Sequence, residues 1–304
     1  MSGERLRVEV EGRSLELSNL DKVLYPDVGF TKGEVIDYYT RIAPVLLPHL
    51  RDRALTRIRY PNGVTGTSFF EKNRPAATPD WVRVATLPAP GSTRGRETID
   101  YVVADDLPTL VWLANLAALE LHTPQWRIGA HPDTMVVDLD PGPPAGLREC
   151  CQVAVLMRDR LADDGVAAYP KTSGKKGMQL CCPVAGTQSA EVVSEYAHRI
   201  ARELERTHPK LVVSRMAKNL RPGKVFIDWS QNNAAKTTVA PYSLRAGPAP
   251  SVSTPLTWDE VEAVAADGRR RLRPFTAAEV LTRVDEYGDL LAPLLDGGPE
   301  LPTR

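Results

Sequence analysis

Three aspartates stand at the ends of apolar stretches, where a buried sheet would present them. Asp138 and Asp140 lie two residues apart in VVDLDPG, and Asp228 ends the run KVFID. Residues two apart in a strand project from one face, so the first two carboxylates share a side of the sheet. Phosphoryl transfer commonly uses two divalent cations about 3.5–4 Å apart, and such ions prefer carboxylate oxygens. The spacing predicts a metal-binding triad, although Pro141 and Gly142 also fit an aspartate that only forms a turn.

Groups that suit a polyphosphate lie between and after these acids. The turn KTSGKKG, residues 171–177, offers a hydroxyl, lysines and backbone amides. It lacks the GxxxxGK[ST] pattern and the following helix of a Walker A loop. Further polar and positive side chains come from Arg221, Gln231, Lys236 and Arg245. Carboxylates for metals beside cations for phosphates indicate a nucleotide site.

Charge and cysteine content exclude some classes of protein. The 304 residues include 38 Lys and Arg and 38 Asp and Glu, so a DNA-binding surface has to be a local patch. No run approaches the roughly 18 apolar residues of a membrane span, which predicts a cytoplasmic protein without a membrane partner. The cysteines form two adjacent pairs, Cys150-Cys151 and Cys181-Cys182. This spacing fits neither a zinc site nor a secreted disulfide framework, and it predicts buried reduced thiols.

Local patterns predict the elements that position these residues. Residues 6–20 read as a hairpin, and Thr31 with Glu34 forms a capping box that opens a helix over 32–47. Residues 54–60 alternate as a strand, and 79–100, rich in Pro, Gly and Arg, read as a mobile surface loop. The later expected elements are helices 107–121 (capped by Asp106), 146–164 and 190–204 (started by Ser189), strands 134–140, 166–170, 178–184 and 224–229, and a linker over 243–255. Two more helices are expected to begin at capping boxes, Thr257 with Glu260 and Thr276 with Glu279.

Nine strings identify a family that the chain resembles, the polymerase domain of bacterial ligase D, within the archaeo-eukaryotic primase superfamily. They run in the family's order from about Asn19 to Leu291 and comprise NLDKVLYP, TKGEVIDYY, PNGV, FFEK, LHTPQW, VVDLDPG, TSGKKG, KVFIDWSQN and TVAPYSLR. The chain looks like a stand-alone relative of the mycobacterial and actinobacterial type, without an attached ligase or nuclease module.

The resemblance implies an α/β fold in which an RNA-recognition-motif-like sheet carries the acids and an N-terminal α/β module forms a cleft with it. We expect a single domain over 1–304. Its parts are an N-terminal module over 1–105 with the DNA contacts, a metal and nucleotide core over 106–250, and C-terminal helices over 251–304.

The resemblance also assigns roles to matching positions. Asp138, Asp140 and Asp228 match the metal-binding acids, and the nucleotide-binding positions are His122, Ser173, Lys176, Gln179, Arg221, Gln231 and Arg245. Taken alone, a histidine after an apolar run is more often structural, and the family match favours the binding role for His122. Gln179 stands where the family more often has histidine, so one contact becomes a neutral amide.

On the DNA side the family match implies three further groups of residues. Asn19, Lys22 and Lys32 match residues that receive a 5′-phosphate, and a lysine at a helix start favours a bound anion. Phe69 and Phe70 match a stacking platform for bases, with Phe70 the favoured stacker because adjacent strand residues face opposite sides. Arg57 and Arg59 share a strand face and are expected to hold the DNA backbone, since Ile58 replaces a frequent basic residue.

The implied reaction is attack of a primer 3′-hydroxyl on the α-phosphate of a nucleoside triphosphate, directed by a template. Two divalent metal ions, manganese before magnesium, are the expected cofactors. Ribonucleotide preference, filling of short gaps bearing a 5′-phosphate, a separate ligase and end-binding protein, a monomeric state and a nucleoid location complete the expectation. Two alternatives stay open, a primase that starts chains without a primer and a non-catalytic module that binds DNA ends.

Overall fold

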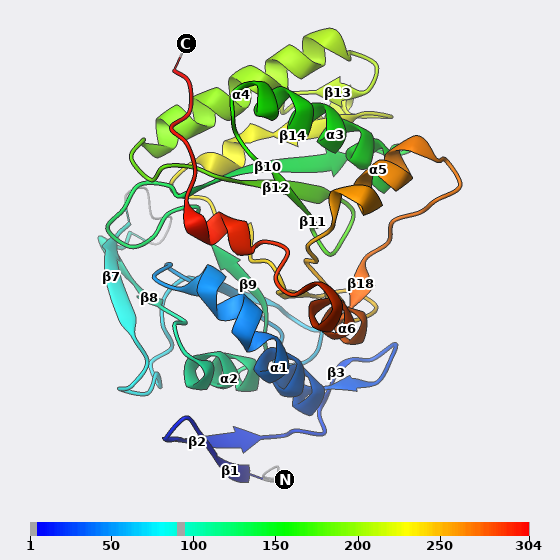
Figure 1. The fold of residues 1–304 in the computed structure, drawn as a ribbon. Coiled ribbons are helices and arrows are strands. Elements are labelled where there is room, and N and C mark those ends of the chain that lie inside the picture. The colour runs from blue at the N-terminus through cyan, green and yellow to red at the C-terminus, as the bar shows by residue number, and fades with distance from the viewer. Residues whose placement is uncertain (1–4, 90–94, 304) are drawn as a thin grey trace.

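A five-stranded sheet containing the three aspartates lies at the centre of the upper half in the computed structural model, which describes residues 5–89 and 95–303 (Figure 1). Its order is β11-β12-β10-β14-β13. Only β13 and β14 pair in parallel. The bounds are Thr134–Pro141 for β10, Tyr169–Thr172 for β11, Met178–Pro183 for β12, Val212–Val213 for β13 and Val225–Asp228 for β14.

The connections confirm the RNA-recognition-motif-like sheet. Apart from the short edge strand β13, the chain runs β10, α3 (Leu147–Asp163), β11, β12, α4 (Ala190–Thr207) and β14. This is a β-α-β-β-α-β unit in which β10 and β12 are the inner two of the four strands. Both helices lie on one face of the sheet (Figure 1). Alternate β10 side chains, including Val137 and Leu139, pack in the cluster with these helices. Asp138 and Asp140 therefore face the opposite side.

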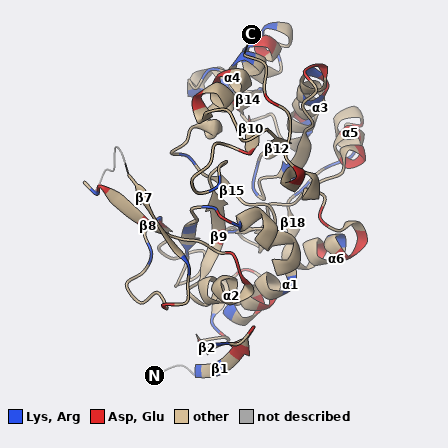
Figure 2. Ribbon diagram, turned by 60° about the vertical axis from the view of Figure 1, so that its left-hand side comes forward, with Lys and Arg blue, Asp and Glu red and all other residues tan. Residues whose placement is uncertain are grey.

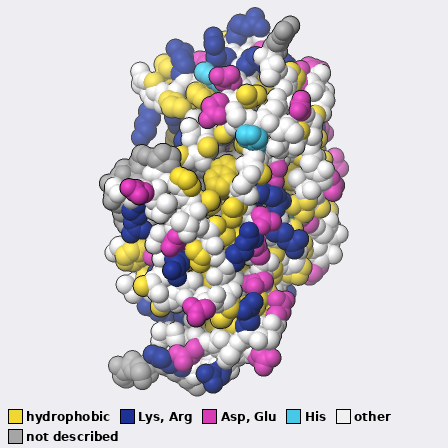
Figure 3. Space-filling model, turned by 90° about the vertical axis from the view of Figure 1, so that its left-hand side faces the viewer, with side chains coloured by type: hydrophobic (Ala, Val, Ile, Leu, Met, Phe, Trp, Pro, Cys, Tyr) yellow, Lys and Arg dark blue, Asp and Glu magenta, His cyan; other side chains and the backbone are white. Residues whose placement is uncertain are grey.

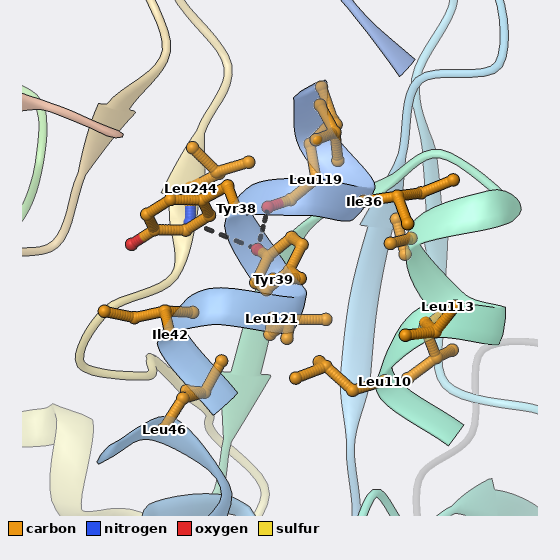
Figure 4. Close-up of a cluster of buried hydrophobic side chains, with 14 of the residues drawn as sticks. Ile36, Tyr38, Tyr39, Ile42, Leu46, Leu110, Leu113, Leu119, Leu121 and Leu244 are labelled. Carbon is orange, nitrogen blue, oxygen red and sulfur yellow. Dashed lines mark hydrogen bonds between the residues drawn. The ribbon is translucent and has the colours of Figure 1, made fainter. Parts of the chain in front are cut away.

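A second sheet, of order β15-β9-β5-β6, lies below the first in the view of Figure 1. Its strands are Thr56–Arg59 (β5), Phe69–Glu71 (β6), Ala118–Thr123 (β9) and Thr238–Val239 (β15), and its core includes α1 (Lys32–Leu50) and α2 (Leu107–Asn115). Tyr39 of α1 joins distant segments in this core (Figure 4). Its hydroxyl donates to the Leu119 carbonyl at 2.7 Å and accepts from the Leu244 amide at 3.1 Å.

Short elements complete the described residues. Three two-stranded sheets are formed by β1 (Arg5–Val10) with β2 (Arg13–Ser18), β3 (Val23–Tyr25) with β4 (Phe30–Thr31), and β7 (Val84–Pro88) with β8 (Thr98–Val102). A three-stranded sheet contains β16 (Leu244–Arg245), β17 (Ser251–Val252) and β18 (Phe275–Thr276). The remaining helices are α5 (Trp258–Ala266) and α6 (Ala277–Tyr287), with 3-10 turns at Lys218–Leu220, Trp229–Asn232 and Ala292–Asp296.

Capping side chains start the helices where the sequence predicts. At α1 the Thr31 hydroxyl accepts from the Glu34 amide at 3.3 Å, and the Glu34 carboxylate accepts from the Thr31 amide at 2.7 Å. Capping boxes also open α5 and α6, and Asp106 caps α2. These contacts satisfy amides that have no partner inside a helix.

The helix predicted over 107–121 is wrong in its second half. α2 ends at Asn115, and Ala118–Thr123 forms β9. Ala117 has a positive φ of 56°, a left-handed conformation that stops the helix. The strand then pairs with β5 on one side and β15 on the other. Because this strand is buried on both faces, its apolar run has no alternation to distinguish it from a helix.

The surface loop predicted over 79–100 is wrong in two stretches, because Val84–Pro88 forms β7 and the residues from Thr98 onward form β8. β7 and β8 pair from Val84 with Val102 to Pro88 with Thr98, and the hairpin reaches out from the rest of the chain (Figure 2). The centre of the loop at 88–96, to which the sequence assigns no role, lies outside the described residues at 90–94. The linker predicted over 243–255 likewise contains two strands, β16 and β17.

Two large hydrophobic clusters cross the part boundaries expected from the sequence. α2 and β9 were expected in the metal core but pack in the first cluster with α1, and so do Leu244, Val252, Ala277 and Val280. The second cluster lies between the five-stranded sheet and α3, α4 and α5. The four cysteines are free and buried, as predicted. Over the described residues, none of the helices has the length and apolar character to cross a membrane.

Candidate active site

The three aspartates meet on one face of two neighbouring strands. Asp138 of β10 is the direct cross-strand partner of Asp228 on β14, and Asp140 follows on the same face of β10. Asp228 is held in place from its own chain. One carboxylate oxygen accepts from the Ser230 amide at 3.0 Å and hydroxyl at 2.5 Å, and the other accepts from Gln231 Nε2 at 3.2 Å.

Crowding of these carboxylates changes their acidity. Burial and the neighbouring charges of Asp140 and Asp228 raise the pKa of Asp138 to about 7, although a hydrogen bond from Gln179 opposes the rise. Burial and the Asp228 charge also raise the pKa of Asp140. Like charges held this close favour either a bound proton or a bound cation.

The donor set fits a divalent cation in its chemistry. Carboxylate oxygens are the ligands that magnesium and manganese prefer, and three of them converge here. Among residues 5–89 and 95–303, no group of three or more His, Cys, Asp or Glu side chains is already arranged as a ligand set. At present Asp138 accepts a hydrogen bond from Gln179, and Asp228 accepts from Ser230 and Gln231. A bound ion would replace some of these hydrogen bonds.

The turn after β11 packs directly on the strand of the acids. A Cβ added to Gly177 would lie 2.5 Å from the Leu139 carbonyl oxygen and 3.5 Å from a carboxylate oxygen of Asp140. Ser173 organises the turn, since its hydroxyl accepts from the Lys175 amide at 3.3 Å and the Gly177 amide at 3.2 Å. Lys176 is exposed on this turn.

Glu120 of β9, which sequence reasoning missed, is the centre of a second charged group. It is only 1% exposed. One carboxylate oxygen accepts from Lys175 Nζ at 3.1 Å, and the other accepts from Arg245 Nη1 at 2.9 Å and His122 Nε2 at 3.2 Å. Burial raises the pKa of Glu120, but the His122 hydrogen bond and the two positive charges outweigh it and hold that pKa at about 2. Burial lowers the pKa of His122, which favours the neutral ring.

Lys171, also missed from the sequence, connects Gln179 to the second sheet. This buried ammonium donates to Gln179 Oε1 at 2.5 Å, the Ser253 hydroxyl at 2.7 Å and the Val239 carbonyl at 3.0 Å. Burial lowers its pKa to about 8. Because an ammonium only donates, the Gln179 amide oxygen must face Lys171, which leaves its NH₂ for Asp138 on the neighbouring strand.

Two more cationic side chains flank the aspartates. The guanidinium of Arg221 lies 3.8 Å from the ring centroid of Phe226 and donates to the Met216 carbonyl at 2.9 Å. Its positive charge opposes the rise in the pKa of Asp140. Lys236 Nζ lies 2.5 Å from the Ser230 hydroxyl and 3.9 Å from Asp228. The predicted nucleotide residues thus fall into three neighbouring sets: Gln179, Arg221 and Gln231 act on the triad, Ser173 and Lys176 belong to the turn packed on β10, and His122 and Arg245 contact Glu120.

Of the residues predicted for a 5′-phosphate, Lys32 begins α1, and Asn19 and Lys22 lie on the turn between β2 and β3. The backbone of Lys32 is bonded to that turn. Lys22 is exposed, and its Nζ donates to Asn62 at 3.2 Å. Lys32 is buried instead, and its Nζ donates to the Ser18 carbonyl at 2.5 Å. Burial and the Lys22 charge lower the pKa of Lys32 to about 8, so the two ammonium groups are neighbours beside exposed Asn19.

The backbone amides at this helix start are already used. The Lys32 amide donates to the Lys22 carbonyl and the Gly33 amide to the Leu20 carbonyl, both at 2.8 Å. An anion here would therefore meet lysine side chains rather than the first amides of α1, which corrects the helix-start reasoning applied to Lys32.

Arg57 departs from its predicted contact with the DNA backbone. It is fully buried and pairs with Glu71 at 2.8 Å. Arg59, also paired with Glu71 at 3.0 Å, keeps part of its side chain exposed. The prediction of a DNA contact is wrong for Arg57 in this structure, because the pair with Glu71 holds its charge inside the second sheet.

Both members of the predicted aromatic platform are exposed. Phe69 is 46% exposed and Phe70 59%, at the edge strand β6. Alternation along a strand predicts that one of the two rings is buried. This prediction is wrong, because β6 is a three-residue strand at the sheet edge and both rings remain exposed. On the face in Figure 3, hydrophobic side chains gather near the middle with Lys and Arg around them.

The family model described as the LigD primase-polymerase domain matches residues 31–291. This chain belongs to that family. Over 92% of its length it is 46% identical to the multifunctional non-homologous end joining protein LigD of Mycolicibacterium smegmatis. Over 90% it is 34% identical to the bifunctional LigD of Bacillus subtilis. The chain spans 36% and 43% of those two proteins.

A solved relative of this LigD primase-polymerase domain has the same fold. The polymerase domain from Mycobacterium tuberculosis ligase D, in complex with DNA, is 42% identical and superposes with a TM-score of 0.87. The match covers 94% of this chain and 99% of that one. The family and the α/β primase-polymerase fold expected from the nine sequence strings are thereby confirmed.

Proposed function

We propose that the protein extends a primer 3′-hydroxyl with nucleoside triphosphates under the direction of a template, to fill short gaps or ends during DNA repair. The observation that carries the proposal is the convergence of Asp138, Asp140 and Asp228 beside cationic side chains. Membership of the LigD primase-polymerase family supports it, and so does the relative solved with DNA.

Asp138, Asp140 and Asp228 would hold two divalent cations, with manganese preferred and magnesium as the alternative. Bound there, such ions supply charge stabilisation for displacement at the α-phosphate. The protein's part is positioning and neutralisation, so no side chain has to act as a strong base. Lys176, Arg221 and Arg245 bind the triphosphate, and Ser173 holds the turn that carries Lys176. Gln231 and Gln179 orient Asp228 and Asp138.

Contacts on the DNA side would select the substrate. Lys22 and Lys32 lie close enough to affect each other and would receive the 5′-phosphate beyond a short gap, together with Asn19. Phe69 and Phe70 are exposed rings on which bases can stack, an interaction worth about 1–3 kcal/mol per base. Arg59 is the partly exposed member of the arginine pair and would contact the backbone.

We further propose that ribonucleotides are preferred over deoxyribonucleotides, and that a separate ligase and an end-binding protein complete the repair. The curated relatives carry non-homologous end joining in their names. A monomer meets the chemical requirements, because all the residues named above come from one chain.

The test is extension of a labelled primer on a gapped duplex with a downstream 5′-phosphate. Wild type should add templated nucleotides with manganese, and ribonucleotides should be used at least as well as deoxyribonucleotides. Asp138→Ala should reduce addition to background, because the triad loses a ligand. Lys22→Ala should weaken gap binding without abolishing addition, and a 5′-hydroxyl end should have a similar effect on wild type.

Two outcomes would favour the alternatives. Dinucleotide synthesis on a bare template would identify a primase. Gap binding without any addition by wild type, with either metal, would contradict the enzyme proposal and favour an end-binding module.

A further inference from the structure

Glu120 is a buried carboxylate placed inside a site that should bind an anion. Its partners come from three parts of the chain, with His122 on β9, Lys175 on the turn after β11, and Arg245 and Ala246 at β16. The Ala246 amide donates to the same oxygen as Lys175, at 3.0 Å. Every polar contact of both oxygens among the described residues is therefore with a donor.

Charge alone does not explain this residue. A negative charge near a triphosphate repels it, so on electrostatic grounds the nucleotide site would be better without Glu120. Two cations, Lys175 and Arg245, more than balance the charge, and the carboxylate is held ionised. The effect of Glu120 that remains is to fix the positions of Lys175, Arg245 and His122.

The position of Arg245 is determined from two sides. Its terminal nitrogen pairs with Glu120, while its aliphatic part lies against the turn after β11, where a Cβ added to Gly174 would be 2.5 Å from Arg245 Cγ. Gly174 has a φ of +73°, which suits glycine in this close approach. Without Glu120 the guanidinium would lose its 2.9 Å ion pair, and Nη1 would keep only its 3.3 Å contact with His122 Nε2, a ring that Glu120 itself holds.

We propose that Glu120 is a positioning residue of the nucleotide site, which holds Arg245, His122 and Lys175 in the arrangement that binds the triphosphate. The inference rests on the proposed function, since it assigns these three side chains to a bound nucleotide. Lys175, which is exposed, stands in the variable position of the TSG-x-KG turn and adds a cation beside Lys176.

The decisive variant is Glu120→Gln, tested by equilibrium binding of ATP and of inorganic triphosphate. Each carboxylate oxygen faces donors, so the amide NH₂ must oppose one set of them. If positioning dominates, both probes bind about tenfold more weakly or worse, because contacts to a charged group are lost. KM for the nucleotide should rise while kcat changes much less. If charge dominates, both probes bind more tightly, which would overturn the proposal.

Glu120→Asp separates the effect of side-chain length from the effect of charge, and it is the variant to test if Glu120→Gln fails to fold. It keeps the negative charge but shortens the side chain, so weaker binding of both probes is expected. Binding equal to wild type by the aspartate variant would overturn the proposal. Glu260→Gln is the matched control, since Glu260 also pairs with an arginine, Arg283, at 2.6 Å, far along the chain on α5. It should leave nucleotide binding unchanged.

The outcome is separable from failure of the proposed function. Wild type must first bind ATP and extend a primer. If it does, and Glu120→Gln binds ATP at least as tightly, only the positioning role is lost. If wild type does neither, the function itself is wrong, and the inference about Glu120 is overturned with it.

Discussion

Carboxyl groups in this protein have pKa values moved in opposite directions by their neighbours. Asp138 faces two other acids, and its pKa is raised to about 7, whereas buried Glu120 faces cations and its pKa is held at about 2. Burial raises both, so the partners decide the difference. The triad thus carries negative charge that a bound cation can neutralise, whereas the charge of Glu120 is already neutralised by Lys175 and Arg245.

Asp138→Asn should stabilise the protein in the presence of a chelator. The substitution removes a like charge directly opposite Asp228, a cross-strand repulsion worth up to about 1 kcal/mol. Manganese should stabilise wild type in proportion to binding and should have little effect on the variant. Thermal unfolding with and without the ion measures both effects. Asp285→Asn, at an exposed aspartate on α6, is the control. Equal stabilisation of Asp138→Asn and wild type by manganese would contradict the role of the triad.

The sequence indicated the triad because a strand's alternation and an apolar run are local signals. Glu120 and Lys171 could not be found this way, since their partners lie 82 residues or more away in several cases, as with Lys171 and Ser253. Glu120 also lies in an apolar run that reads as a helix, whereas the structure has strand β9 there. The side to which the Glu120 side chain points could therefore not be predicted. Arg57 illustrates the reverse error, since nothing in its own strand shows that Glu71 pairs with it.

At the scale of elements, the turn of residues 173–177 lies between the strand of the acids and Arg245, two parts of the proposed nucleotide site. It contacts β10 through Gly177 and Arg245 through Gly174. The close packing of this turn, a spacer between the aspartate triad and the Glu120 group, therefore sets the distance between them.

Gly177→Ala should displace this spacer. The added methyl group would lie 2.5 Å from the Leu139 carbonyl, so the turn must shift, at a cost of roughly 1–3 kcal/mol for overpacking. KM for the nucleotide should rise because Lys176 moves with the turn. Gly268→Ala is the control, since its Cβ would meet Arg148 only at ordinary contact distance, 3.7 Å. Chemical unfolding and steady-state kinetics measure both effects, and unchanged values for Gly177→Ala would show that the turn is not tightly packed.

Elements with end signals could be predicted, and elements without them could not. Capping boxes at Thr31, Thr257 and Thr276 mark helix starts by local hydrogen bonds. The hairpin of β7 and β8 has few buried residues, and the pairing of its backbone, rather than an apolar pattern, defines it. Prolines and glycines nearby therefore suggested a loop.

At the scale of the whole molecule, Asp289 connects the segment after α6 to the first hydrophobic cluster by hydrogen bonds. Its carboxylate accepts from His49 at 2.8 Å and from the Tyr242 hydroxyl at 2.6 Å. Burial raises the pKa of Asp289, but these hydrogen bonds and the His49 charge outweigh it and lower that pKa below its usual value. The three residues come from α1, the segment before β16, and the segment after α6.

Asp289→Asn should cost about 2 kcal/mol at neutral pH, the usual range for hydrogen bonds to a charged group. Because the folded-state pKa is lowered, the contribution is present above the unfolded value of about 3.9 and is lost as the pH falls through the folded value. Urea unfolding of wild type and variant between pH 3 and 7 should therefore converge at the acidic end. A difference that is constant with pH would contradict the assignment.

The return of distant residues to the first cluster has a consequence for synthesis on the ribosome. α1, α2 and β9 emerge early, but Leu244, Val252, Ala277 and Val280, which pack against them, emerge more than 120 residues after β9 begins. At a synthesis rate of roughly 5–20 residues per second, the apolar surface of the early segments stays exposed for several seconds or more before these residues emerge. The strands and the two flanking helices of the five-stranded sheet occupy residues 134–228 without interruption. We expect the five-stranded sheet with α3 and α4 to form before the first cluster is complete, and α5 to pack on α3 when it emerges.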